Sequence, residues 1–364
     1  MPDRRRDKIG RRAFLKKAAA GAALGAASTG LGTAAVDTSK IRSYNPEMEY
    51  RPLGDTGIMV SAVCLGGHWK RVDTMIPGIF GGGKWLNADL DNPDFKQNRY
   101  DVVSRCIERG INYIDACTWQ EVMAYSEALR DRRDSMYLGF SWYQEEMRKP
   151  DYRTAEALLG TLDKGMRQAK LDYVDVWRIT MISQSSKHTE GEVEQMMIAL
   201  DKAREQGKVR FTGLSSHDRP HIKWMIEAYP EIVQVVCTPF TVKSKERPTD
   251  SLFDAVRQHG VGVFGIKPFG GTSLFKGDST LDSPDAEADD EIARLTIRYI
   301  LATDAITAPI PGLINAHQVD NMARAVQERR ELDGEEQAKL EKAGDEMYAR
   351  LPSDYQWLKD WEWV

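Results

Sequence analysis

Short apolar runs alternate with amphipathic stretches along most of the chain. Most of the runs are rich in β-branched residues and nearly continuous in apolar character, as expected of parallel strands buried on both faces. We predict strands at Ala62–Leu65, Asn112–Ile114, Met136–Gly139, Tyr173–Trp177, Val209–Thr212, Ile232–Val236, Val261–Ile266 and Ile306–Ile310. The clearest helical patterns between them are residues 97–109, 153–169, 191–206, 288–301 and 316–328. Eight strands interleaved with helices predict an α/β fold, a (β/α)₈ TIM barrel. A doubly wound open sheet is the alternative, but no G-x-G-x-x-G follows the first strand.

Three segments lie outside this regular alternation. Two short apolar runs, Met48–Arg51 and Ile58–Val60, flank Gly-Asp-Thr-Gly and predict an N-terminal hairpin. Residues 70–96 predict a long loop on the catalytic side of the barrel, with an inert surface excursion as the alternative. Residues 347–364 hold three Trp within ten positions. Because such side chains are costly to leave in water, we expect this tail to dock on the barrel.

The first 36 residues have the parts of an export signal. Basic residues precede an Ala/Gly-rich apolar run that ends in small residues. Arg11-Arg12 followed by Phe14 resembles the twin-arginine motif, which implies contact with the twin-arginine translocation machinery and a periplasmic or extracellular destination. A disordered basic tail is the alternative, and a lasting membrane span is disfavoured by the Gly, Ser and Thr in the run. We therefore assign 1–36 to a signal peptide, 37–47 to a linker and 48–346 to the barrel.

Charge and cysteine usage narrow the function classes. Residues 1–36 carry eight Lys and Arg against two Asp, a charge of +6, which leaves −11 of the total of −5 for the remaining residues. A body that acidic is a poor match for nucleic acid. The four cysteines are far apart without C-x-x-C spacing, so we expect buried thiols and no metal site.

Functional groups of such a barrel come from the C-terminal ends of the strands and the loops that follow. The polar or loop-forming residues at those positions are His68, Asp115, Ser141, Thr180, Ser215, Ser216, His217, Gln234, Lys267, Pro311 and Gly312.

Several motifs stand in the same order as in a known family. They are YRPLGDTGIMVSAVCLGG, GINYIDA, SEAL, LDYVDVW, GKVRFTGLSSHD and IPG followed by Gln318. Together, over residues 48–346, they resemble the aldo-keto reductases. The resemblance implies a (β/α)₈ barrel that binds NADP(H) at the strand ends and reversibly reduces aldehydes and ketones.

The resemblance also implies a catalytic set of Asp, Tyr, Lys and His around one carbonyl oxygen. Asp115 matches the family Asp. The Tyr position falls on Gln120 or Met123, the Lys position on Ser141 and the His position on Thr180. We therefore expect a divergent site that does not reduce simple aldehydes at ordinary family rates.

Other residues are candidates for the missing chemistry. His68, His217 and Lys267 follow three strands and, with Asp115, form a possible acid/base cluster. The alternative is that both histidines are hydrogen-bonded loop residues. Tyr125 is either a displaced proton donor or, as we favour, a core residue of a helix.

For the cofactor, the resemblance implies contacts at Ser215, Gln234, Lys267, Pro311, Gly312, Gln318 and Asn321. The run Leu313-Ile314-Asn315 lacks the Arg or Lys that would meet a 2′-phosphate, and a phosphate without a cation loses its strongest hydrogen bonds. We expect NAD or NADP, without a strong preference for NADP.

These observations favour an exported oxidoreductase acting on a small carbonyl or polyol, with carbohydrates suggested by the Trp-rich loops. Two alternatives use the same barrel. One is a protein that binds a ligand or partner without turnover. The other is a lyase, isomerase or hydrolase that uses Asp115 with His217 or His68.

Overall fold

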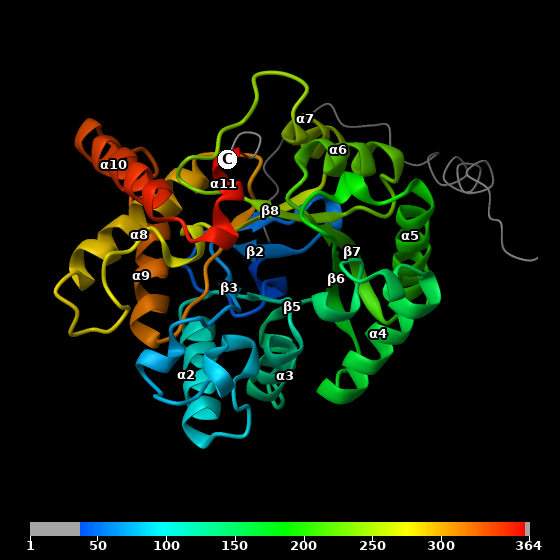
Figure 1. The fold of residues 1–364 in the computed structure, drawn as a ribbon, viewed down its shortest axis with the longest axis horizontal. Coiled ribbons are helices and arrows are strands. Elements are labelled where there is room, and N and C mark those ends of the chain that lie inside the picture. Colours follow the sequence, from blue (N-terminus) through cyan, green and yellow to red (C-terminus); the bar gives the residue numbers. More distant parts are fainter. Residues whose placement is uncertain (1–36, 361–364) are drawn as a thin grey trace, which may run out of the picture. The chain divides into compact units, whose positions relative to one another are not determined.

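Eight parallel strands neighbour one another in chain order, from β3 to β10 (Figure 1). This computed structural model describes residues 37–360. The strands are β3 (Leu65–Gly66), β4 (Tyr113–Ala116), β5 (Tyr137–Phe140), β6 (Val174–Thr180), β7 (Val209–Ser215), β8 (Val235–Pro239), β9 (Gly262–Ile266) and β10 (Ala308–Ile310). A parallel bridge between Gly66 and Gly312 joins the first strand to the end of the last. The predicted barrel is thus confirmed.

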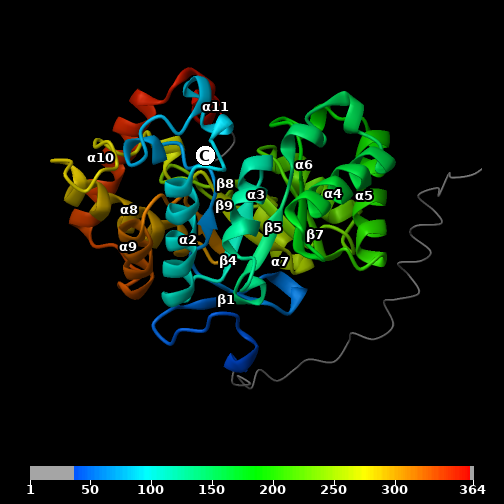
Figure 2. The same cartoon turned by 90° about the horizontal axis from the view of Figure 1, so that it is seen from below.

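Helices cover the outside of this barrel (Figures 1 and 2). They are α2 (Pro93–Glu108), α3 (Trp119–Ala128), α4 (Ala155–Ala169), α5 (Glu190–Glu205), α6 (Arg219–Ala228), α7 (Leu252–His259), α8 (Ala286–Leu301) and α9 (Ala316–Gln327). All five predicted helices are present, with ends shifted by a few residues at most. The helices α3, α6 and α7 are short, and each begins at a Thr, Asp or Ser whose side chain accepts a backbone N–H of the first turn.

Apolar side chains fill the barrel interior. Tyr113 and Phe264 stack at its centre with ring centroids 4.3 Å apart. The predicted hairpin, β1 (Tyr50–Pro52) and β2 (Met59–Ser61), adds Leu53 of its turn to the same core cluster. Gly54 has φ +51, and a Cβ there would lie 2.2 Å from a backbone oxygen, so only glycine permits this close approach. The hairpin therefore closes the end of the barrel where β9 begins.

The segment before the hairpin is not a free linker. Arg42 donates a hydrogen bond to the Met136 carbonyl at 2.7 Å and pairs with Asp175 at 3.3 Å, and Ile41 is buried. Residues 41–47 thus belong to the barrel unit, which begins at Ser39. The proposed signal peptide, residues 1–36, lies outside the described residues. Within residues 37–360, no helix combines the length and apolar character needed to span a membrane.

The chain after α9 packs on the barrel through a second apolar cluster. Helix α10 (Gly334–Arg350) and the short α11 (Trp357–Asp360) contribute Met347 and Leu358, both fully buried. The predicted docking of the tail is confirmed as far as Trp357, whereas Trp361 and Trp363 lie outside the described residues.

Candidate functional site

A cavity of about 460 Å³ opens at the C-terminal ends of the strands. Its lining comes from residues that follow seven different strands and from the loop 70–96, so the site depends on the closed barrel. Nine of the predicted site residues line it: His68, Asp115, Ser215, His217, Lys267, Pro311, Gly312, Gln318 and Asn321.

An ion pair forms the floor of this cavity. Arg178 on β6 donates from Nε to Asp115 Oδ1 at 2.6 Å, and its Nη2 bonds the second carboxylate oxygen. Both residues are at most 5% exposed. A buried carboxylate is stable when it is paired and hydrogen-bonded in this way. Asp115 is therefore bound on both carboxylate oxygens to a permanent cation, Arg178, rather than to a histidine of the predicted acid/base cluster.

A buried carboxylate extends the network away from the floor. Ser141 Oγ donates to Glu146 Oε2 at 2.6 Å and lies 2.7 Å from Thr180 Oγ1, which in turn accepts Arg178 Nη1 at 3.1 Å. Burial raises the pKa of Glu146, although Ser141 and backbone N–H donors oppose the shift. The sequence reasoning missed both Arg178 and Glu146. A charged residue near the C-terminal end of a strand, where functional groups of a barrel gather, was the available signal for Arg178.

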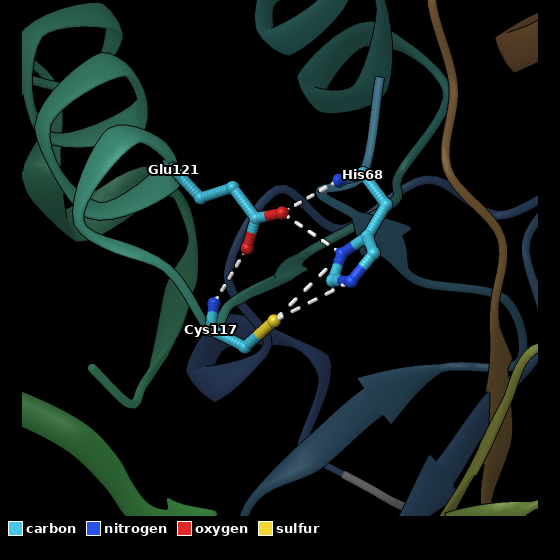
Figure 3. A group of neighbouring side chains, drawn as sticks. All are labelled: His68, Cys117 and Glu121. Atoms are coloured by element: carbon cyan, nitrogen blue, oxygen red, sulfur yellow. Dashed lines mark hydrogen bonds and ion pairs between the residues drawn. The ribbon is translucent and has the colours of Figure 1, made fainter. Parts of the chain in front are cut away.

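One wall carries a histidine held by a second buried carboxylate (Figure 3). His68, at φ +57, donates its backbone N–H to Glu121 at 2.6 Å, and its Nδ1 lies 2.9 Å from the same oxygen. The other Glu121 oxygen accepts the Cys117 N–H at 2.7 Å. With Nδ1 facing the carboxylate, Nε2 is the nitrogen left to exchange a proton with a ligand. The His68 ring also lies 4.5 Å from the ring of Trp85.

Cys117 completes this group without acting as a strong ligand. Its Sγ lies 3.7 Å from His68 Nδ1 and 4.0 Å from Nε2. Burial and the Glu121 carboxylate raise the pKa of the thiol, which disfavours the thiolate that a metal or an electrophile needs. Since Glu121 already accepts N–H bonds on both oxygens, we assign the group to the orientation of His68 rather than to metal binding.

The opposite wall joins a histidine, a lysine and the C-terminal tail. His217 Nε2 lies 3.3 Å from Lys267 Nζ, and Trp357 stacks on the His217 ring at 4.2 Å. Burial, together with the neighbouring Arg148, lowers the pKa of Lys267 to about 8. Burial and the lysine also lower the pKa of His217 well below its usual value, so its ring is neutral near pH 7.

The far end of the cavity meets the N-terminus of α9. Asn315 caps this helix by accepting the Gln318 N–H at 2.8 Å, and Gln318 Oε1 accepts the Ile314 N–H at 3.0 Å. The side chain of Asn321 accepts Arg294 and donates to the Asp290 carbonyl. A helix N-terminus beside Gly312 suits a phosphate.

A family comparison matches this arrangement. The profile of the aldo/keto reductase family matches residues 79–345, which is most of the chain. The chain belongs to the aldo/keto reductase family.

Individual aldo/keto reductases are distant. L-galactose dehydrogenase of Arabidopsis thaliana is 22% identical over 307 residues, covering 79% of this chain and 90% of that protein. The aldo-keto reductase yakc of Schizosaccharomyces pombe, named with NADP(+), is 28% identical over 240 residues, covering 62% and 66%. The solved aldo-keto reductase of Bacillus halodurans in its holo form has a TM-score of 0.57 at 18% identity, covering 81% and 96%. That structural likeness concerns the fold.

Two of the candidate site residues, Gln234 and Tyr125, do not line the cavity. Gln234 directly precedes β8, at the end of the barrel opposite to the cavity, and its Oε1 accepts the Thr212 N–H at 3.2 Å. It therefore cannot reach a cofactor at the strand ends. Tyr125 is fully buried in α3 and donates to the Gly66 carbonyl at 2.8 Å. Tyr125 thus has the core role that we favoured and is not a displaced proton donor.

Proposed function

We propose that this member of the aldo/keto reductase family is an NAD(P)-dependent oxidoreductase for a polar carbonyl or polyol, with sugars as the candidate class, and that its proton-transfer group differs from the family tyrosine. The observation that carries the proposal is the Asp115–Arg178 pair at the cavity floor. The resemblance implies a lysine paired with Asp115, and Arg178 supplies a cation to the same carboxylate from another strand. The sugar class is supported by the likeness to L-galactose dehydrogenase.

The hydrogen-bonding groups that line the cavity are of the kinds that a nicotinamide dinucleotide needs. Ser215 offers a hydroxyl at the strand ends. At the other end of the cavity, Gly312 has no side chain to obstruct a phosphate, and the N-terminus of α9 offers backbone N–H groups to it. When bound, the nicotinamide would accept or donate a hydride. The protein's own residues must then hold the substrate and move the accompanying proton.

Each group around the substrate end has a distinct physical role. Arg178 keeps a positive charge beside the reacting oxygen, which stabilises negative charge that develops on it. His68 presents Nε2 as a hydrogen-bond partner for a substrate oxygen. Trp85 and Trp357 offer flat apolar surfaces of the kind that stack on sugar rings.

Single-turnover oxidation of bound NADH or NADPH tests this proposal. We expect a panel of keto sugars to oxidise the bound nucleotide, while simple aldehydes react roughly 10²- to 10⁴-fold more slowly than in ordinary family members, because the usual general acid is absent. Calorimetry without substrate should first show that the nucleotide binds. A protein that binds no nucleotide, or never oxidises it, would support the ligand-binding alternative instead.

We also propose that the chain is exported in folded form by the twin-arginine route and works in the periplasm or outside the cell. The support is the sequence alone: Arg11-Arg12 before Phe14 and the weakly apolar run that follows. A variant with both arginines changed to lysine should stay in the cytoplasm as uncleaved precursor. Undiminished export of that variant would exclude the route.

A further inference from the structure

The two positions that differ from the family pattern at the ends of β5 and β6 are hydrogen-bonded to each other. Ser141 Oγ and Thr180 Oγ1 are 2.7 Å apart, and the chain continues to Glu146 at 2.6 Å from Ser141. Thr180 lines the cavity, whereas Ser141 and Glu146 are fully buried behind it. The three groups thus form a short path from the cavity to a buried carboxyl.

The neighbours of this path fix the direction of its hydrogens. Arg178 Nη1 donates to Thr180 Oγ1 at 3.1 Å, and the backbone N–H of Thr180 donates to Glu146 Oε2 at 2.8 Å. When Glu146 is ionised, Ser141 donates to it and Thr180 must donate to Ser141. Thr180 then has one lone pair left for a hydroxyl group in the cavity.

We propose that Thr180, Ser141 and Glu146 form a proton relay between the substrate oxygen and a buried carboxyl, in the role that a tyrosine has in the resembled family. This inference rests on the proposed oxidoreductase function. Only Thr180 touches the substrate, and Ser141 and Glu146 act through it.

The proton transfers along the relay break and form equal numbers of bonds in both directions of the reaction. In oxidation, the substrate hydroxyl gives its proton to Thr180 Oγ1, Thr180 gives its own to Ser141, and Ser141 gives its own to the Glu146 carboxylate, while the hydride leaves carbon for NAD(P)⁺. Three O–H bonds break and three form. In reduction, protonated Glu146 gives its proton to Ser141 and the same transfers run backward to the carbonyl oxygen. The oxygen gains the electron pair of the C=O bond, and a bound NAD(P)H would supply the hydride to carbon.

Two features of the surroundings support this role. Thr180 is in register with Ser215 on the neighbouring strand, the residue that the resemblance places at the nicotinamide amide. Burial raises the pKa of Glu146, because desolvation disfavours the charged carboxylate and so favours the form that holds a proton.

The test is the single-turnover hydride-transfer rate of conservative variants. Thr180→Val, Ser141→Ala and Glu146→Gln should each slow the reaction about 10²-fold or more, since general acid–base catalysis typically contributes 10²- to 10⁴-fold. A double Ser141→Ala/Glu146→Gln variant should be no slower than either single one, because both break the same path. Thr180→Ser, which keeps the hydroxyl, should restore most of the rate.

A matched control is Thr212→Val, which removes another buried hydroxyl, bonded to the Ile232 carbonyl and distant from the cavity. It should leave the rate unchanged. The rate of reduction by the wild-type protein should also fall as pH rises through the pKa of Glu146. This fall should be absent in Glu146→Gln, whereas a purely structural role of Glu146 would predict no such change in the pH profile. An active wild type with an unaffected Glu146→Gln variant overturns the relay alone. A wild type that transfers no hydride overturns the oxidoreductase proposal, and the relay with it.

Infrared difference spectroscopy gives a readout that needs no turnover. A pH titration of the wild-type protein should show a protonated carboxyl band that is missing in Glu146→Gln and altered in Ser141→Ala. If no such band depends on Glu146, this carboxyl does not store a proton and the relay is excluded.

Discussion

Arg178 and Asp115 share two parallel hydrogen bonds although they stand on strands separated by β5. This pairing decides the character of the site. Arg178 occupies both carboxylate oxygens of Asp115, so the carboxylate is no free base for a lyase or isomerase. The pairing also fixes Arg178 so that its Nη1 donates to Thr180 Oγ1 at the cavity wall.

The ion pair should matter strongly for stability. Arg178→Met leaves Asp115 buried without a partner and should lower the free energy of unfolding by about 3–5 kcal/mol. Adding Asp115→Asn to that variant should recover part of the loss, because the uncompensated charge disappears. Urea unfolding measures both. Arg130→Met, which breaks an exposed pair with Glu127, is the control and should change stability by less than about 1 kcal/mol.

The sequence predicted the barrel because its signal is repeated eight times, so a shifted end such as β8, which begins at Val235 rather than Ile232, does not alter the topology. The same shift is decisive for a single residue. The resemblance predicts Gln234 at the cofactor end, but Gln234 directly precedes β8 at the opposite end of the barrel. An error of a few residues in a predicted strand end assigns a side chain to the wrong end of the barrel. Sequence patterns do not locate strand ends with that accuracy.

The sequence predicted a site residue only where its position at the end of a strand was enough to place it in the site. His68, Asp115 and Lys267 were found in this way, and all line the cavity. Two of their partners were not found, because Arg178 meets Asp115 and Glu121 meets His68 only through tertiary packing. Glu121 reads locally as a helix-capping residue, which it also is, and nothing near it in sequence indicates that it holds His68.

Nucleotide preference should be weak. No Arg or Lys among residues 313–322 follows the last strand, and the acidic Asp290 accepts His317 Nε2 at 2.5 Å near the start of α9. A missing charge-assisted contact costs roughly 1.5–3 kcal/mol, or about one to two decades in affinity. Calorimetry should therefore give similar affinities for NADH and NADPH, and Ile314→Arg should shift the preference toward NADPH.

A marked NADPH preference in the wild type would contradict this expectation. It would mean that a cation from another segment reaches the 2′-phosphate. Arg71 lines the cavity and uses Nη1 on the Gly277 carbonyl and on Ser279, so Arg71→Gln would identify it as that cation.

His68 should act in substrate binding. In His68→Ala the cavity loses the imidazole that Glu121 orients, so KM for a sugar should rise about tenfold, the cost of one hydrogen bond, while kcat changes less. Glu121→Gln should show a weaker effect of the same kind, because it frees the ring. His317→Ala, at the far end of the cavity, is the control for the substrate KM. A large fall in kcat with unchanged KM would instead make His68 the proton-transfer group.

The last prediction concerns cations at the substrate end. Within the part of the chain that the structure describes, Lys70, Arg148 and Lys267 line the cavity, and none of them has a carboxylate as a partner. Cations that have no carboxylate partner are free to form charge-assisted hydrogen bonds with an anionic ligand. Substrates that carry a carboxylate, such as sugar acids, should therefore bind more tightly than the corresponding neutral sugars.

This preference should depend on pH through Lys267. The groups that act on its charge are His217, Arg148, Cys117, Lys70 and Arg178. Because burial and these cations lower its pKa to about 8, Lys267 is charged below that pH and loses its proton above it. Affinity for a carboxylate should thus fall roughly 10- to 100-fold as pH rises through 8, the cost of one charge-assisted hydrogen bond. Calorimetry near pH 8 should also show proton uptake on binding, since the anion favours charged Lys267. In Lys267→Met both effects should vanish, and in Lys267→Arg tight binding should persist above pH 8. Equal affinity for sugar acids and neutral sugars at pH 7 would show that these cations bind the cofactor's phosphates instead. In that case Lys267→Met would reduce the affinity for NADH.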